Sequence, residues 1–375
     1  MKTSAPLRDI RQLCCLGLGG QAIMPALFEG VQKIVPSHFQ IFFWAGENYN
    51  VTNMFCLNLP SVVHLAKLYL SEFVNKRERE IKPPFSELME TERGLIDWNR
   101  FMCHKFFKSD YYNEILKPLE ARHIIGTVIH ERDRALGELV IWRAPHERPF
   151  SIKDRQLLLC LAPYIAHGLN ARPNNDQPYI DSGNHGLVVT SQDGEIQYAT
   201  PHGRELLFWA THPQISLSTV KSQPPPAPPL LAELCKNLVS IFQGESQPAP
   251  VKYHINPWGR FCFRAYWLED VQYSRNALIA VTIELHKPLS LTLFSRMQAY
   301  GLSPRQKEVC QLLARKYAYP RIAEQLNISV HTLIDYVRRI YEKLEVHSHE
   351  ELLEKLGILT GPKMDPHAFH IASRR

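Results

Sequence analysis

The sequence lacks the features that mark several large classes of protein. It has no C-x-x-C pair, no cysteine and histidine spacing typical of a zinc finger, and no stretch of about 20 apolar residues that could span a membrane. It also lacks the Walker A, G-x-S-x-G and H-E-x-x-H motifs. We therefore expect a cytoplasmic protein that is not an enzyme, with no cofactor, no metal site, no secretory signal and no membrane contact.

The composition is that of an ordinary globular protein. The chain has 375 residues, of which 45% are hydrophobic and 21% are charged, and its net charge is +6. This length indicates two or three domains, and the mild positive charge is compatible with nucleic-acid binding without proving it. The eight cysteines lie mostly in apolar runs, such as Cys160, so we expect buried free thiols in a reducing compartment.

The first segment, residues 1–172, is predicted to be an α+β domain. Apolar spacing indicates an opening helix from Ile10 to Leu18, and Ser151 is expected to cap a long helix that ends near Leu169. Strands are predicted at 40–45, 51–57, 122–130 and 135–143, with a helix at 61–74 that Ser61 caps and a polar loop at 75–84. Glu78 and Glu80 lie in that polar stretch, where we expect a solvated face.

The second segment, residues 179–287, is also predicted to be α+β. Residues 171–178 are polar and contain prolines, so they are expected to form a linker, and the proline-rich run at 223–229 is expected to be a spacer. A proline-rich ligand for a partner domain is the alternative for that run. Strands are predicted at 186–190, 195–199, 251–255, 260–267 and 277–285, with helices at 201–211 and 230–242.

The third segment, residues 290–360, has the pattern of a helix-turn-helix. Ser303 and Gln306 can form a capping box at the start of a helix, with Pro304 at its first position. A short helix at 318–326 and a turn at 327–328 follow, and Ser329 can cap a third helix. The apolar residues of that third helix recur on one face: Leu333, Val337, Ile340 and Leu344.

The opposite face of the third helix carries the candidate DNA-binding residues. They are His331, Ile334, Asp335, Arg338, Arg339 and Lys343. Arginines can bind guanine edges or phosphates, and a lysine can bind a phosphate. From the helix pattern alone, a solvated face in a small bundle explains these residues equally well.

A resemblance to a known family decides between these readings. The matching pieces are LSPRQKEVCQLLA at 302–314, IAEQLNIS at 322–329, Thr332-Leu333 and IYEKLEV at 340–346. In order, spacing and chemistry they resemble the LuxR-type helix-turn-helix family. The resemblance implies four helices, the third entering the major groove and the fourth supporting dimerisation. By position, Ile334, Asp335, Arg338 and Arg339 would face the groove, with Thr332 and Lys343 near the DNA backbone.

Three positions depart from the family pattern. The family usually has Lys at the position of Ile334, His at that of Tyr336 and Gly at that of Lys316. In addition, Asp335 places a negative charge toward the DNA, where it would weaken binding or accept from a cytosine amino group. A degenerate regulator that acts through protein contacts is therefore a second hypothesis.

The upstream segments resemble a GAF-like and then a PAS-like domain. The first likeness rests on FSIKD at 150–154 and GELVIWR at 137–143, and the second on GLVVT at 186–190 followed by DGEI at 193–196. Together these likenesses imply a cytoplasmic homodimeric transcription regulator that binds double-stranded DNA at half-sites about one turn apart. Such a regulator could contact RNA polymerase and could bind a small-molecule ligand. The aromatic residues Phe42, Phe43, Trp44 and Trp142 would line a ligand pocket in one interpretation and belong to the core in the other.

An enzyme is the alternative from a different class. Gly17, Gly19 and Ala22 match G-x-G-x-x-A, the phosphate loop of dinucleotide-binding domains. That motif requires a strand before the glycines and a helix after them. Pro25 interrupts the expected helix, and the only acidic partner in reach, Glu47, is too distant in sequence. The structural interpretation of these glycines is close packing of helices.

Overall fold

The computed structural model describes residues 5–171, 178–216, 227–269 and 277–358. The chain divides into two compact units: residues 1–176 with 183–286, and residues 177–182 with 287–375. None of the helices in the described ranges is long and apolar enough to cross a membrane. The linker at 171–178 and the proline-rich run at 223–229 fall mostly outside the described residues.

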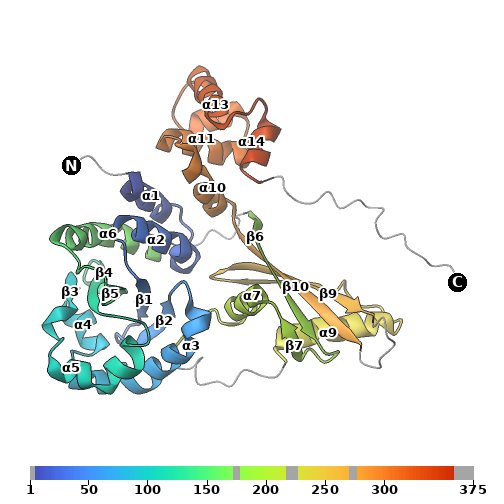
Figure 1. The fold of residues 1–375 in the computed structure, drawn as a ribbon. Helices are drawn as coiled ribbons and strands as arrows, with labels where there is room; N and C mark the ends of the chain where they lie inside the picture. The colour runs from blue at the N-terminus through green and yellow to red at the C-terminus, as the bar shows by residue number, and fades with distance from the viewer. Residues whose placement is uncertain (1–4, 172–177, 217–226, 270–276, 359–375) are drawn as a thin grey trace. The chain divides into compact units, whose positions relative to one another are not determined.

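The N-terminal part of the first unit is a five-stranded antiparallel sheet covered by helices on both faces (Figure 1). The strand order is β2-β1-β5-β4-β3. The strands are β1 (Phe39–Ala45), β2 (Val51–Phe55), β3 (Leu95–Asp97), β4 (His123–Glu131) and β5 (Arg134–Arg143). The predicted strands at 40–45, 51–57, 122–130 and 135–143 are confirmed, because alternating apolar residues allow each strand to bury one or both faces.

Two groups of helices cover this sheet. On one face lie α1 (Ala5–Cys14), α2 (Gly20–Ile34) and α6 (Ile152–Asn170). On the other face lie α3 (Leu59–Leu68), α4 (Phe85–Thr91) and α5 (His104–Lys108), with two π-helical turns, η1 (Tyr69–Phe73) and η4 (Tyr111–Leu116), and two 3-10 turns, η2 (Arg77–Glu80) and η3 (Trp98–Arg100). Ser151 caps α6 through a capping box with Asp154, as predicted.

Several local expectations for this part were wrong. Asn58, not Ser61, precedes α3, and that helix passes into the π-helical turn at Tyr69. The stretch from 75 to 84 contains η2, and Glu78 within it is fully buried rather than solvated. Cys160 is exposed although its neighbours are apolar, because it lies on the outer face of α6. Glu78 is buried together with Lys82, four positions further on, so the polar character of this stretch did not reveal its burial.

The structure also lacks the strand–loop–helix arrangement that a dinucleotide-binding loop at Gly17 and Gly19 requires. Gly17 and Gly19 lie between two helices, α1 and α2, and no strand precedes them within the described residues from Ala5 onward. Their φ angles of 70° and 80° form the turn between these helices. A Cβ atom on the adjacent Gly20 would lie 2.7 Å from Leu169 of α6, so close helix packing explains part of this glycine cluster.

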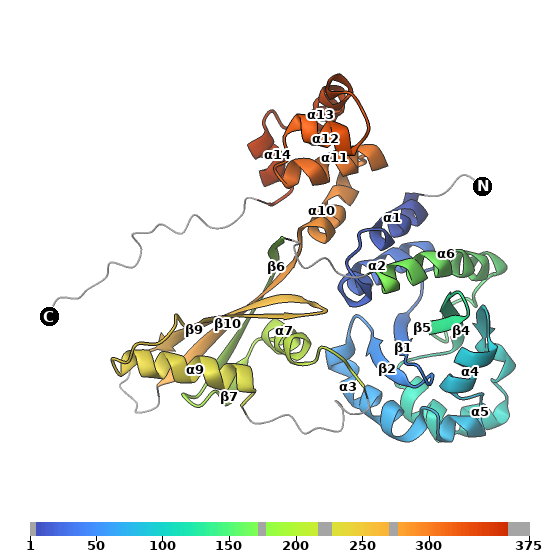
Figure 2. The ribbon, with the colours of Figure 1, turned by 180° about the vertical axis from the view of Figure 1, so that it is seen from behind.

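The rest of the first unit contains a second antiparallel sheet, with the order β7-β6-β10-β9-β8 (Figure 2). Its strands are β6 (Tyr179–Thr190), β7 (Ile196–Ala199), β8 (Val251–Asn256), β9 (Gly259–Leu268) and β10 (Leu278–Pro288). The helices with it are α7 (Pro201–Thr211) and α9 (Pro229–Phe242). Helix α9 packs against β9, and Thr190 contacts Cys235 of α9 at 3.2 Å. The predicted α+β class is confirmed for both upstream sheets.

The second unit is a helical bundle. Its helices are α10 (Leu289–Met297), α11 (Pro304–Ala314), α12 (Tyr319–Gln325), α13 (Val330–Leu344) and α14 (His349–Lys355), with a 3-10 turn, η5 (Gln298–Tyr300), between α10 and α11. One apolar core joins all five helices. The predicted all-α C-terminal domain is confirmed, with α11 to α14 as its four helices.

Candidate nucleic-acid interface

The first helix of the candidate interface begins as its sequence predicts. The side chain of Ser303 accepts from the Gln306 backbone N–H at 3.3 Å, and Gln306 returns a bond to the Ser303 N–H at 2.9 Å. Val309 and Leu313 of this helix lie in the core. Helix α11 is thus anchored at its start and along its buried face, which makes it a rigid support for the two helices that follow.

A tight turn joins α12 to α13. Asn327 has a φ of 50°, a left-handed conformation that asparagine tolerates better than most residues. Ser329 then caps α13, because its Oγ accepts from the Thr332 N–H at 3.0 Å. Arg305 of α11 donates to the carbonyl of Leu326, the residue that follows α12. The turn and the cap together fix the angle between α12 and α13, as a helix-turn-helix requires.

Helix α13 presents two chemically distinct faces. Leu333, Val337, Ile340 and Leu344 are all buried, so the predicted apolar stripe is confirmed. On the solvent side, the side chains of His331, Thr332, Ile334, Arg338, Arg339 and Lys343 are exposed, and Asp335 is half-buried. Because one helical face binds the core, the other is free to enter a groove, and the structure leaves the predicted residues accessible for this purpose.

Asp335 does not stand alone on this surface. Its carboxylate accepts from Arg338 Nη2 at 3.3 Å, one helical turn further along α13. The Arg338 side chain is largely exposed and the Asp335 side chain is 43% exposed, so the pair contributes little to stability. Its effect is instead to orient the Arg338 guanidinium and to cancel part of the positive charge at the centre of the face.

Lys343 is held differently from the two arginines. Its ammonium group donates to the Gly301 carbonyl and to Gln306 Oε1, both at 3.1 Å. These bonds tie the C-terminal half of α13 to the start of α11. Lys343 therefore has a structural role in the bundle, a role that the sequence pattern did not indicate.

Sequence reasoning did not single out the exposed cations that lie before and on α12. Arg315 and Lys316 follow α11, and Arg321 is on α12 with its guanidinium 4.1 Å from the centre of the Tyr317 ring. Lys316 has a φ of 59°, which explains why glycine is the usual residue there in the family pattern. A count of basic residues flanking the short helix would have identified them as candidates.

Comparison with known families agrees with this geometry. Residues 300–356 match the family model described as bacterial regulatory proteins, luxR family. No curated protein matches the chain.

Solved structures with some likeness include Escherichia coli SdiA, with 12% identity, a TM-score of 0.28 and coverage of 90% of this chain and 91% of that one. The GAF domain of the cyanobacteriochrome TePixJ has 16% identity, a TM-score of 0.27 and coverage of 42% and 92%. The ligand–DNA complex of Vibrio cholera VqmA has 19% identity, a TM-score of 0.22 and coverage of 45% and 81%. These TM-scores are too low to carry an argument.

The scaffold from α11 to α14, with a capped third helix and a free polar face, defines a DNA-binding domain of the helix-turn-helix class. The match over residues 300–356 specifies the class further. Residues 300–356 are therefore a helix-turn-helix domain of the kind found in the luxR family of bacterial regulatory proteins.

Proposed function

We propose that the protein is a sequence-specific transcription regulator that reads DNA with α13. The observation that carries this proposal is the exposed face of α13, which presents Arg338 and Arg339 on a helix whose other side is locked into the core. An α-helix fits the major groove of B-DNA, and arginine is the residue that most often reads guanine there. Residues 1–172, 179–287 and 290–360 are proposed as its GAF-like, PAS-like and DNA-binding domains.

Each residue of the face has a proposed partner on the DNA. Arg338 and Arg339 are assigned to guanine edges or phosphates, and Asp335 to a cytosine amino group. Ile334, whose side chain is 48% exposed, is assigned to a thymine methyl group, because an apolar side chain gains from that contact and not from a phosphate. His331, Thr332 and Lys343 are assigned to the DNA backbone near the two ends of α13, with Lys316 and Arg321 beside them.

An exposed apolar face on the second sheet is the observation that supports a proposed homodimer. On the face opposite α9, its strands expose large apolar side chains: Leu187, Tyr198, Tyr253, Ile255 and Tyr266. An apolar face of this kind is a common site of protein association. We propose that a homodimer forms through the upstream domains, acts in the cytoplasm with RNA polymerase as a partner, and responds to a signal there.

Selection from random DNA tests the proposal. The full chain should enrich one sequence from a random duplex pool at moderate salt, and the enriched site should be a pair of half-sites about one turn apart. Arg338→Ala should weaken binding to the selected site by about 1–3 kcal/mol and relax the preference at one base. Arg148→Ala, which removes an exposed arginine from the upstream part of the chain, is the matched control and should bind like the wild type.

The alternative hypothesis makes a different forecast. If wild-type protein enriches no sequence, the DNA-reading proposal is wrong, and a regulator that works through protein contacts becomes the better hypothesis. The half-neutralised surface at Asp335 and Arg338 is the observation that favours this second candidate.

A further inference from the structure

A cavity of about 60 Å³ lies inside the N-terminal domain, between the sheet and the helices α3, η1 and η4. Phe43 and Trp142, two of the four aromatics considered from sequence, line it, whereas Phe42 and Trp44 do not. The strand alternation explains this division, because β1 turns Phe39, Ile41 and Phe43 to one face and Phe42 and Trp44 to the other. The walls are mostly apolar, and polar groups gather at one end.

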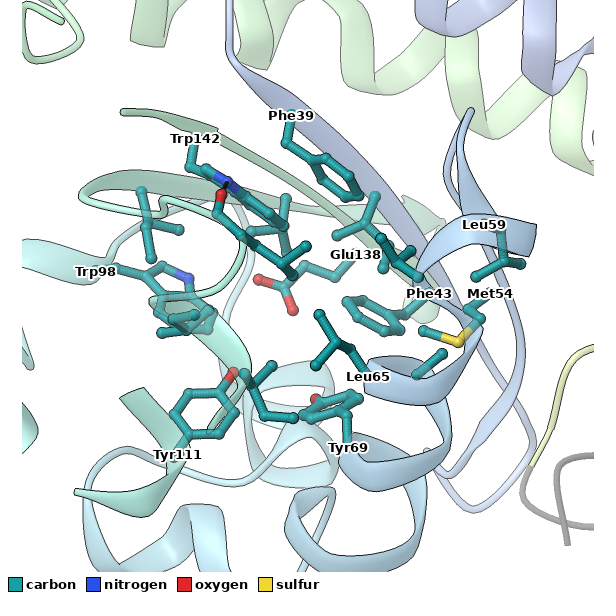
Figure 3. Close-up of a pocket in the computed structure, with 18 of the residues that line it drawn as sticks. Phe39, Phe43, Met54, Leu59, Leu65, Tyr69, Trp98, Tyr111, Glu138 and Trp142 are labelled. Carbon is teal, nitrogen blue, oxygen red and sulfur yellow. Dashed lines mark hydrogen bonds between the residues drawn. The ribbon is translucent and has the colours of Figure 1, made fainter. Parts of the chain in front are cut away.

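Glu138 of β5 supplies the most unusual polar group of this cavity. Its carboxylate lies among Trp98, Phe43 and Leu65 in Figure 3. The side chain is buried, and its Oε1 atom has no hydrogen-bond partner. Burial raises the pKa of Glu138 to about 7. A buried carboxylate oxygen without a partner is costly, so this position requires a physical explanation.

The charge of the nearby Lys82 acts to lower the pKa of Glu138, but its ammonium group is hydrogen-bonded to a different acid. Lys82 Nζ donates to Glu78 Oε2 at 2.7 Å, and both side chains are almost completely buried. Glu78 also accepts from the backbone N–H groups of Asn75, at 2.9 Å, and Phe85, at 2.6 Å. The Glu78–Lys82 pair is thus closed and neutral, which leaves the ionised form of Glu138 without a bonded cation among the described residues.

The groups around Glu138 suit a cation from outside the protein. Tyr69 and Tyr111 line the cavity with their rings, and burial raises the pKa of both phenols well above the ordinary value, so they stay neutral. The indole N–H of Trp98 makes no hydrogen bond of normal geometry, but it lies close enough to the Glu138 carboxyl to lower its pKa, and Lys82 Nζ lies 5.2 Å from the centre of the Trp98 ring. A carboxylate surrounded by aromatic rings is the arrangement that attracts an ammonium group, through charge and through cation–π contact.

The backbone is specialised at the same place. Tyr69 begins one π-helical turn and Tyr111 begins the other, so both turns deliver a tyrosine to the cavity. π-Helical turns are rare and occur frequently at functional sites. On the opposite wall, a Cβ atom at residue 126 would lie 2.3 Å from Glu138 Oε1, so only Gly126 in β4 leaves room for the carboxylate. The chain has three separate local features that accommodate this buried acid.

We propose that this cavity binds a small apolar molecule that carries one protonated amine, with the ammonium group paired to Glu138 beside Trp98 and Tyr111. The apolar walls accommodate the rest of the ligand, and the small volume favours a ligand of a few heavy atoms over a drug-sized one. This ligand class would be the signal of the proposed regulator. Amine binding itself is independent of the proposed function, and only its effect on DNA binding rests on that function.

Direct binding to the full chain tests this inference. The probes are primary amines with three to six carbons and benzylamine, each paired with the alcohol of the same carbon skeleton, and binding is measured by calorimetry and by tryptophan fluorescence. We expect at least one amine to bind about tenfold or more tightly than its alcohol. The preference should be lost in Glu138→Gln and kept in Glu131→Gln, a matched change at an exposed carboxylate of β4.

Two further measurements test whether the amine binds in this cavity and whether it pairs with the ionised form of Glu138. Leu65→Phe fills the cavity while leaving the carboxylate in place, and should abolish amine binding even if Glu138→Gln were to disturb folding. Binding should also be tighter at pH 8 than at pH 6, because Glu138 is then ionised and the amine is still protonated. The other charged groups that act on Glu138 are Lys82, Glu78 and Glu92.

The outcomes separate cleanly. Equal binding of amine and alcohol, or unchanged amine binding in Glu138→Gln, would overturn the proposed ligand class. No binding of any probe would mean that the cavity holds only water, which would also overturn it. These measurements use no DNA, so a failed DNA selection would reject the proposed function while leaving the ligand result intact, and the reverse holds equally.

Discussion

At the scale of single residues, the protein contains two acids whose surroundings are opposite in character. Asp335 is on the surface of α13 and has a cationic neighbour, Arg338. Glu138 is buried in the first sheet, and its Oε1 has no partner. Water and salt screen the first charge, whereas the second is desolvated, so changes at the two positions should be seen in different measurements.

The pKa of Glu138 predicts a pH dependence of stability. The native state keeps the Glu138 proton up to a pH of about 7, whereas an exposed glutamic acid releases it near 4.5. Native stability should therefore fall as pH rises between these two values, by about 3 kcal/mol in total, because one pKa unit corresponds to about 1.4 kcal/mol. Glu138→Gln lacks this proton and should not show this part of the fall.

Urea unfolding of both proteins from pH 4.5 to pH 7.5 measures this difference. The stability of Glu138→Gln relative to wild type should increase with pH across that window, while Glu131→Gln should follow the wild-type curve. Parallel curves for wild type and Glu138→Gln would contradict the buried, proton-holding state of this acid.

Asp335→Asn tests the role of the surface acid. Removing the negative charge frees Arg338 and ends the repulsion between the carboxylate and phosphates, so affinity for unrelated duplexes should rise by roughly two- to tenfold. Discrimination at the base that Asp335 contacts should fall. Fluorescence anisotropy with the selected site and a scrambled duplex measures both effects, and a uniform loss of affinity on all duplexes would refute this reading.

At the scale of elements, the helix caps determine how firmly α13 is held. Ser329 satisfies the Thr332 N–H and also contacts the Thr332 hydroxyl at 2.8 Å. Lys343 holds the far end of the same helix against α11. A recognition helix held at both ends loses little conformational entropy on binding, which favours specific contacts over non-specific ones.

Ser329→Ala should destabilise the C-terminal domain by about 1 kcal/mol, because it removes the acceptor for an otherwise unpaired N–H group. For a domain of this size, the melting temperature should fall by about 4–8 °C. Ser329→Gly is the informative control, since glycine at this position costs only a few tenths of a kcal/mol. Thermal unfolding followed by circular dichroism makes the comparison, and equal losses for both variants would argue against a capping role.

At the scale of the whole molecule, the chain combines two sheets of identical strand order with one helical DNA-binding unit. In both sheets the first strand lies between the second and the last strands of its own set. The upstream part contains the cavity with Glu138, and the C-terminal unit contains the polar face of α13. In the proposed regulator, the ligand and the DNA therefore bind to different parts of the chain.

The salt dependence of DNA binding follows from the cations of the C-terminal unit. Each phosphate contact adds about one unit to the slope of log affinity against log salt concentration. Arg339→Ala should reduce that slope by about one unit if Arg339 binds a phosphate, and should change base preference instead if it reads a base. Titrations at several salt concentrations, with Arg148→Ala as the control, decide between these assignments. A slope and a preference both equal to wild type would remove Arg339 from the interface.

The helix-turn-helix was predictable from sequence because its determinants are local. Ser303 and Ser329 cap helices through neighbours three residues away, and Leu333, Val337 and Ile340 recur at the helical period. Four of the five strands of the first sheet were predictable for the same reason, whereas β3 was not predicted, because its three residues are too few to show an alternation. The hydrogen bonds of Lys343 to the start of α11 were not predictable, since its partners lie about 40 positions earlier in the chain.

The sequence by itself determined the helix-turn-helix and most of the strands, because capping, turns and hydrophobic periodicity act between residues close in the chain. The short elements β3, α4 and α5 were not predicted from it. Only the tertiary structure decided that Glu78 and Glu138 are buried. A glutamate in a polar stretch or a strand is normally expected to face water. Glu78 pairs locally, with Lys82 four positions further on, but the burial of this pair, and of Glu138 beside Gly126 and two tyrosines, depends on long-range packing, which leaves no periodic signal in the sequence.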